Sequence, residues 1–247
     1  MDIIEIRYCF KMEEHKHQII DLQLNSQTLE TVSKSHADLP AWTMIDFHQC
    51  PHCPLDAADH PNCPVAVNLV DVVERFENVV SYDKIDLEVT MADRRVFQHT
   101  TAQRGISSLL GLLFATSGCP HTSFLKPMAR FHLPMATRDD TIFRAAGMYL
   151  LAQYFLKQQG EKCDFELRGL KQIYNNLHLL NLEIIGRLRS VIQKDSSVNA
   201  LILLDMLTDA LPSVVEDNLE KIRHLFSPYL SDCFKNIIET RNLKLEI

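Results

Sequence analysis

Proline directly follows four of the seven cysteines in this chain of 247 residues, and this pairing constrains the chain more than any other feature of its sequence. The four pairs are Cys50-Pro51, Cys53-Pro54, Cys63-Pro64 and Cys119-Pro120. Because the chain contains only 10 prolines, chance would place less than one of them directly after a cysteine. Three pairs fall within residues 50–64, which is the spacing of a metal site rather than of scattered core thiols.

The four cysteines form the pattern Cys-x2-Cys-x9-Cys, followed by a distant fourth cysteine. A proline after a ligand removes a backbone donor, fixes its own φ and pushes the cysteine toward extended conformations, which bends the chain away from the site. Bacterial ferredoxins also carry a Cys-Pro at their cluster. We therefore favour an iron–sulfur cluster of the 4Fe-4S type, with four thiolate ligands: Cys50, Cys53, Cys63 and Cys119.

Zinc is the alternative metal, because it takes four cysteines, or three cysteines and one histidine, in tetrahedral geometry. A self-contained zinc site would use four residues of one loop: Cys50, Cys53, His60 and Cys63. Such a site leaves Cys119 spare, while His121 is a substitute ligand two residues from Cys119. Thiolate-bound haem is a minor alternative. The other three cysteines, Cys9, Cys163 and Cys233, read as ordinary buried thiols.

Other polar residues near the cysteines have weaker signals. Four of them are candidates for hydrogen bonds to the ligands: His48, His52, Asp56 and Asp59. Arg104 and the segment 130–132 are candidates to offset negative charge on a thiolate cluster. For each of these residues, solvation at the surface is the simpler interpretation. The chain has no phosphate-binding glycine loop, no Gly-x-Ser-x-Gly and no His-Glu-x-x-His, and Ser107-Ser108 suggests no acyl chemistry.

Hydrophobic periodicity predicts an α+β fold, with two N-terminal β-hairpins and a metal-binding cysteine loop (residues 42–64) between them. The hairpins are expected at residues 2–12 with 17–24 and at 84–90 with 94–100. A helix is expected over 65–80, with Pro64 at its start. Another is expected over 102–117, where three glycines suggest close backbone packing and Gly118 provides the C′ residue.

The remainder of the chain reads as a mostly helical C-terminal bundle. Helices are expected near residues 139–158, 165–193, 197–210 and 213–226, with 165–193 forming one helix or two. Capping-box patterns begin at Thr137 and Ser213. We expect a single domain over 1–247, consisting of a mixed part (1–100), a helical part (101–230) and a tail (231–247).

Charge and hydropathy limit the function classes. A formal net charge of −7 and a pI near 5.9 make general nucleic-acid binding unfavourable. No apolar stretch reaches the length of a membrane span, about 18 residues. The N-terminus resembles no secretory signal, and seven cysteines without one are typical of a reducing compartment, so we expect a cytoplasmic protein.

The cysteine motifs also carry a resemblance. The segments 50–55 (Cys-Pro-x-Cys-Pro-Leu), 60–69 (His-Pro-x-Cys-Pro-Val-Ala-Val-Asn-Leu), 117–121 (Ser-Gly-Cys-Pro-His) and 127–134 resemble an uncharacterised family of bacterial proteins. The resemblance extends over nearly the whole chain. It implies a bacterial, single-domain protein in which both Cys-Pro segments belong to one unit, and it supplies no catalytic assignment.

From these features we expect a metal-centre protein that acts as a binding, sensing or structural module. The alternatives are a zinc-binding structural or interaction protein, and a metalloenzyme or electron carrier that uses the same site. A further alternative is a scaffold for an unknown protein partner, in which the helical part from Phe143 to Phe226 presents an amphipathic groove. Ligand count separates these classes, because catalysis by a metal Lewis acid needs an open coordination position.

Overall fold

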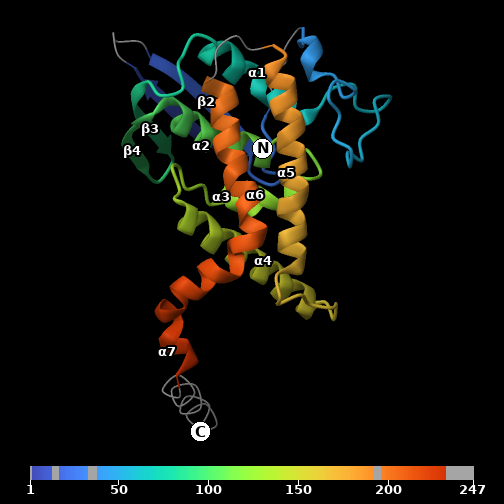
Figure 1. The fold of residues 1–247 in the computed structure, drawn as a ribbon, viewed down its shortest axis with the longest axis vertical. Helices are drawn as coiled ribbons and strands as arrows, with labels where there is room; N and C mark the ends of the chain where they lie inside the picture. The colour runs from blue at the N-terminus through green and yellow to red at the C-terminus, as the bar shows by residue number, and fades with distance from the viewer. Residues whose placement is uncertain (1, 13–16, 33–37, 192–195, 232–247) are drawn as a thin grey trace.

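Alternating apolar and polar residues build one antiparallel sheet of four strands (Figure 1). The structure is a computed structural model that describes residues 2–12, 17–32, 38–191 and 196–231. Strand β1 (Ile3–Lys11) pairs with β2 (His17–Asn25), and β3 (Lys84–Met91) pairs with β4 (Arg95–Thr101). The order β2-β1-β3-β4 joins the two predicted hairpins through antiparallel pairing of β1 with β3. The two hairpins and the α+β class are confirmed.

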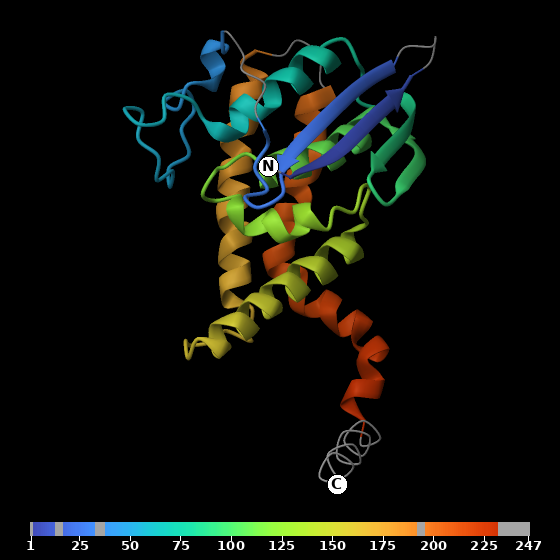
Figure 2. The same ribbon diagram turned by 180° about the vertical axis from the view of Figure 1, so that it is seen from behind.

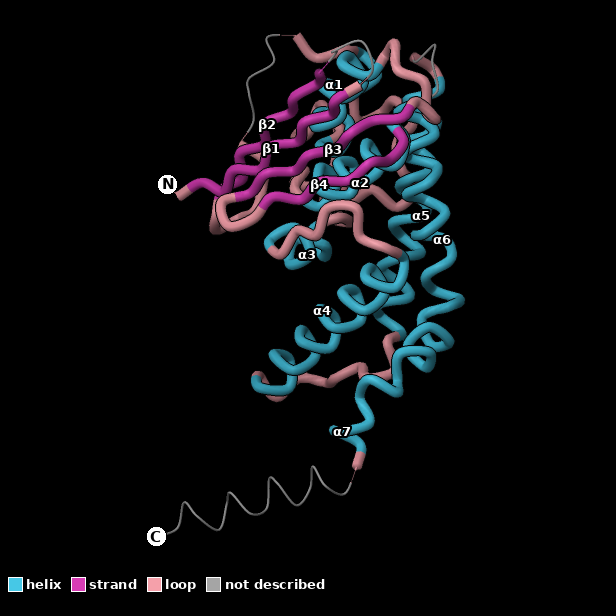
Figure 3. The backbone as a smooth tube through the Cα atoms, turned by 90° about the vertical axis from the view of Figure 1, so that its left-hand side faces the viewer, coloured by secondary structure: helices cyan, strands magenta, loops and turns pink. Residues whose placement is uncertain are grey.

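The two faces of the sheet differ because side chains alternate along each strand. Tyr8 and Phe10 of β1 and Leu87 and Val89 of β3 are almost fully buried on the face that the helices cover. The other face carries ion pairs between strands, such as the one between Arg7 and Asp21. Figures 2 and 3 show the helices gathered on one side of the sheet.

Two helices pack on the buried face: one precedes the second hairpin, and the other follows it directly. Helix α1 (Pro64–Phe76) begins with the predicted proline at its first position and ends four residues earlier than expected. Helix α2 (Ala102–Ala115) ends at the C-cap Thr116, and Gly118 turns the chain with φ of +83°. The glycine therefore acts one position later than the predicted C′ residue. Short 3-10 turns, η2 (Ala41–Thr43) and η3 (Ser123–Leu125), occur in the loops.

Longer helices complete the fold. After α3 (Lys126–Arg130), helix α4 (Arg138–Gln158) begins with the predicted capping box: Thr137 Oγ1 accepts the N–H of Asp140 at 3.2 Å. Helix α5 (Arg168–Arg189) is one helix rather than two. Helices α5 and α6 (Ser196–Ile222) lie side by side, and α6 also contacts α2.

The prediction of two helices near 197–210 and 213–226 is wrong, because α6 continues without a break through residues 210–213. Ser213 is therefore inside a helix and does not cap one. Helix α6 contacts α2, α4 and α5 along its length, and tertiary packing can outweigh a local stop signal such as Pro212. The chain continues as η4 (Arg223–Phe226) and α7 (Ser227–Leu230), which extend away from the sheet (Figure 3).

Two hydrophobic clusters hold these elements. The larger one joins the buried face of the sheet to α1, α2, α5 and α6, and a smaller one joins α4 to the first half of α5. No described helix combines the length and apolar character needed to cross a membrane. Cys233 and residues 232–247, which make up nearly all of the predicted tail, lie outside the described residues.

Candidate metal centre

The cysteine loop is closed at its base by a short pairing of the chain with itself. Met44 and Asn62 form an isolated antiparallel bridge, and the N–H of Cys63 donates to the carbonyl of Thr43 at 2.7 Å. The hydroxyl of Thr43, which is fully buried, donates to Oδ1 of Asn62 at 2.8 Å. These bonds hold the two ends of the loop together, so that Cys63 lies next to Thr43.

Each Cys-Pro pair lies where a regular element begins or ends, or at a turn. Cys63 is the N-cap of α1 with φ of −68° and ψ of 119°, the extended conformation expected before proline. Cys119 follows the turn at the end of α2, where its N–H donates to Oγ of Ser117 at 3.2 Å. Cys50 and Cys53 form a turn in which the N–H of Cys53 donates to the carbonyl of Cys50 at 3.0 Å.

The structure brings these four cysteines into one group. Cys63 and Cys119 are buried in the larger core, and Cys50 and Cys53 pack against it, all as free thiols. Burial raises the pKa of Cys50 to about 12, and the neighbouring thiols of Cys63, Cys119 and Cys53 raise it further. Burial likewise raises the pKa of Cys119. Buried thiols that repel each other's charge stay protonated until a metal cation reverses the balance.

The group is not a formed coordination sphere. Within the described ranges, no three histidine, cysteine, aspartate or glutamate side chains are placed to hold one metal ion. His60 is exposed directly after a turn, and its backbone N–H donates to the carbonyl of Asp56. His121 lies beside the group, but its Nε2 is hydrogen bonded to the carbonyl oxygen of His52 at 2.8 Å.

His52, between the first two cysteines, differs from the solvated interpretation of the sequence. Both of its ring nitrogens are buried, and neither has a hydrogen-bond partner in the described part of the chain. Its ring lies 4.1 Å from the ring of His121, centroid to centroid. Burial lowers the pKa of His52, as does His121, while the backbone of Asn176, which approaches the ring, raises it. A neutral imidazole therefore lies next to Cys53 in the loop. Asp56 and Asp59 are exposed, as their simpler interpretation predicts.

Arg187, which the sequence did not single out, is the main electrostatic feature of the site. Its side chain is 1% exposed, and its guanidinium donates to three carbonyl oxygens at the start of the cysteine loop: Trp42 at 2.8 Å, Met44 at 2.6 Å and Ile45 at 3.1 Å. Its Nε has no partner, and no carboxylate lies within ion-pair distance among the residues described. The positive charge of Arg187 lowers the pKa of Cys50, opposing the effect of burial.

The spacing of buried residues along α5 indicates that Arg187 faces the core. Leu177, Leu180 and Ile184 mark the buried face of α5, and Arg187 continues their spacing. The preceding Gly186 admits the loop, because a Cβ there would lie 2.9 Å from Nδ1 of His48. Helix α5 is therefore shaped to receive the cysteine loop, which Figure 1 shows beside its C-terminal end.

The other cationic candidates do not belong to this group. Arg130 is exposed at the end of α3, as its solvated interpretation predicts. Arg104 and His132 line a cavity that none of the four cysteines lines. Of the cysteines read as buried thiols, Cys9 and Cys163 are only partly buried.

Comparison with known proteins gives one match. A family model described as a domain of unknown function (DUF6901) matches residues 6–227. No curated protein and no solved structure matches the chain. The match agrees with the resemblance to an uncharacterised family, and its span includes the cysteine loop and Cys119.

Proposed function

The chain belongs to this DUF6901 family, and from that premise we propose that it is a metal-centre protein whose four cysteine thiolates bind an iron–sulfur cluster. The ligands are Cys50, Cys53, Cys63 and Cys119. A centre with four thiolates is closed, so it serves structure, sensing or electron transfer rather than Lewis-acid catalysis. We further propose that the chain forms a single domain. We place it in the cytoplasm, because a reducing compartment keeps cysteines free to act as ligands.

One observation carries the proposal: among the described residues, the buried guanidinium of Arg187 has no carboxylate partner, and it lies close enough to Cys50, one of the four free thiols, to lower the pKa of that thiol. Burying a charge is costly unless it is paired, and the three carbonyl bonds of Arg187 offset only part of that cost. An iron–sulfur cluster with four thiolates has a net negative charge. The cluster would therefore neutralise Arg187, and Arg187 would stabilise the ionised thiolates in return.

A cluster also asks less convergence of four cysteines than a single ion does. Four thiolates on zinc at about 2.3 Å must meet with sulfur atoms about 3.8 Å apart. In a cubane cluster each thiolate binds a different iron, so the sulfur atoms stand farther apart. This difference in geometry is the reason that we place the cluster before zinc.

Zinc is the second candidate, and His52 is the observation that favours it. Both of its ring nitrogens are buried, neither forms a well-aligned hydrogen bond with a described residue, and a neutral imidazole is a common zinc ligand. A site of three cysteines and His52 would hold one ion. In that case the centre is a structural clasp for the cysteine loop.

Metal analysis of the full chain tests the proposal. The protein is expressed and purified without oxygen, its visible absorption is recorded, and iron, acid-labile sulfide and zinc are assayed. We expect a brown protein with about four irons and four sulfides per chain. Cys63→Ala should lose the iron, whereas Cys163→Ala, a matched control outside the group, should keep it. A folded, colourless protein without iron overturns the cluster, and one zinc per chain supports the second candidate instead.

A further inference from the structure

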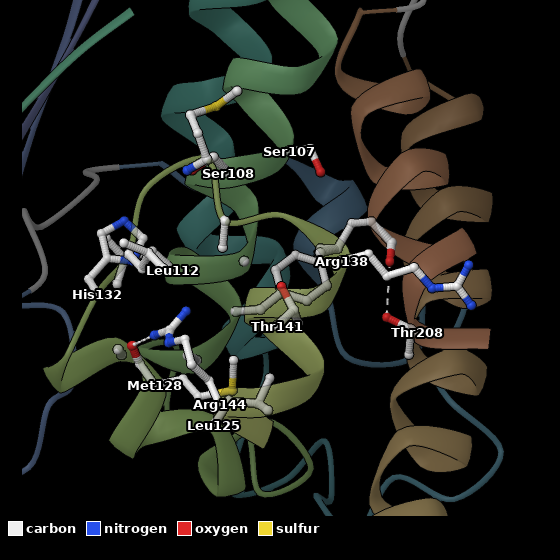
Figure 4. Close-up of a pocket in the computed structure, with 18 of the residues that line it drawn as sticks. Ser107, Ser108, Leu112, Leu125, Met128, His132, Arg138, Thr141, Arg144 and Thr208 are labelled. Carbon is white, nitrogen blue, oxygen red and sulfur yellow. Dashed lines mark hydrogen bonds between the residues drawn. The ribbon is translucent and has the colours of Figure 1, made fainter. Parts of the chain in front are cut away.

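A cavity of about 460 Å³ lies between α2, α3 and α4 and the facing sides of α5 and α6 (Figure 4). Its volume is within the range of small-molecule sites. Most of the wall is apolar, and its apolar residues include Leu112, Phe114, Leu125, Met128, Leu177 and Leu204. None of the proposed metal ligands lines it, so any ligand here is independent of the metal centre.

The charged residues of the cavity are all cationic. Arg104, Arg138 and Arg144 line it, and no aspartate or glutamate does so among the residues described. The whole chain has 32 acidic against 25 basic residues, so three guanidinium groups without a carboxylate depart from its average. This lining attracts a negative charge.

Arg144 is the most buried of the three arginines. Its Nη2 donates to the carbonyl oxygens of Met128 at 2.8 Å and Phe131 at 2.9 Å, which fixes the guanidinium at the cavity wall (Figure 4). The closest acidic influence is Asp140, whose carboxylate already accepts the N–H of Thr137 at 2.9 Å. Arg144 therefore has no ion pair of its own in the described chain, and its donors not used by the two carbonyls remain for a ligand.

A buried polar network forms another part of the wall. Oη of Tyr8 lies 2.6 Å from Nε2 of His132 and 3.3 Å from Oγ of Ser108, which accepts the N–H of Met135 at 2.9 Å. Met135 has φ of +58°, a left-handed conformation that costs on the order of 1–3 kcal/mol and is retained where the surroundings impose it. Burial, and then Arg144, lower the pKa of His132 to about 4, so its ring is neutral at pH 7. The network fixes the loop between α3 and α4 against the cavity.

Gly111 shows that α2 leaves this space open. Glycine inside a helix costs about 1 kcal/mol relative to alanine, and close packing would explain it. That explanation holds for Gly105, where a Cβ would lie 3.0 Å from both Ile85 and Phe10. At Gly111 the nearest atom would be Cδ1 of Leu204, at an ordinary 3.9 Å, and the residue lines the cavity. Among the described residues no close contact therefore requires a glycine at position 111, and its missing side chain leaves room in the cavity.

We propose that this cavity binds an amphipathic anion, a hydrocarbon chain with one anionic head group. The head lies against Arg144, and the chain packs along the apolar wall. A neutral ligand leaves the partly buried guanidinium of Arg144 uncompensated, and a cationic ligand is repelled. The head group is a carboxylate or a phosphate monoester, since arginine binds both.

Calorimetric titration of the full chain tests the proposal with decanoate and decyl phosphate, each below its micelle concentration. Decanol and decyltrimethylammonium are matched probes with a neutral and a cationic head. We expect one of the anions to bind one to one, and decanol to bind at least about tenfold more weakly, since a charged hydrogen bond contributes that much. Equal binding of decanol, or no binding of either anion, overturns the proposal.

Variants locate the site. Gly111→Leu fills the cavity and should abolish binding, while Gly147→Leu is the matched control because nothing lies within 4 Å of a Cβ there. If Gly111→Leu does not fold, Gly111→Ala should still weaken binding. Arg144→Gln should weaken binding of the anion about tenfold and leave decanol unchanged, whereas Arg138→Gln, at an exposed position, should have a smaller effect. If folded Gly111→Leu binds the anion as tightly as the unmodified chain, the ligand lies elsewhere, and the proposal that it occupies this cavity is overturned.

Discussion

Replacing Arg187 by methionine removes the buried guanidinium that ties α5 to the cysteine loop. The side chain is similar in length and apolar, so the change deletes charge and hydrogen bonds while keeping most of the volume. Three carbonyl oxygens, those of Trp42, Met44 and Ile45, lose their donor at once.

The magnitude follows from these contacts. Each hydrogen bond from a charged donor contributes about 1.5–3 kcal/mol, and a carbonyl left buried without a partner costs a further 1–3 kcal/mol or so. Removal of the guanidinium's own burial cost offsets part of this loss. We expect Arg187→Met to reduce the free energy of unfolding by about 3–5 kcal/mol, a large share of the 5–15 kcal/mol typical of a folded domain.

Urea unfolding of anaerobic protein measures this loss, and the reduction potential of the bound centre provides a second readout. Deleting a positive charge beside a cluster makes reduction harder, so the potential should fall. Arg187→Lys is the matched control, because it keeps the charge but loses the planar fork that reaches three carbonyls. Arg187→Lys should therefore restore the reduction potential more fully than it restores the free energy of unfolding. An Arg187→Met protein with unchanged midpoint, metal content and potential would refute the reasoning.

Three further predictions concern the rest of the fold. Gly105→Ala should destabilise the protein by about 1–3 kcal/mol, because the new methyl group would crowd Ile85. Gly111→Ala should instead stabilise it by about 0.4–1 kcal/mol, because the methyl group has room there. Thermal unfolding of both variants measures the two effects. Thr137→Ala should cost about 1 kcal/mol by removing the cap of α4, and Thr137→Ser should restore it in the same assay. Because the folded pKa of His132, about 4, is below its ordinary 6.5, stability should fall as pH drops from about 6.5 to 4. Urea midpoints of His132→Gln should fall less over this range than those of the unmodified chain; an equal fall contradicts the assignment.

The parts of the fold that the sequence predicts correctly depend on local chemistry. Strand alternation placed both hairpins, and the side chains of Thr137 and Asp140 satisfy each other's backbone without help from the remainder of the chain. The extended conformation of Cys63 likewise follows from the proline after it.

The parts that it misses depend on contacts between distant segments. Locally, Arg187 is one arginine among the charges of a helix, and only the return of the cysteine loop, more than 140 residues earlier in the chain, makes it a buried cation. Helix α6 similarly packs against neighbouring helices from distant parts of the sequence, and such contacts are invisible to local patterns. The cavity beside Gly111 depends on where α4 and α6 lie, so a helical glycine could not be assigned to close packing or to open space in advance.

Cys119 gives the most direct test of the four-thiolate centre, because it is the one proposed ligand outside the cysteine loop. Iron and sulfide are measured in anaerobic Cys119→Ala and in Cys163→Ala, with folding of both verified by circular dichroism. We predict that Cys119→Ala loses iron and visible absorption while Cys163→Ala retains about four irons per chain. Equal metal content in the two folded variants would contradict the centre, because Cys119 would then not be a ligand.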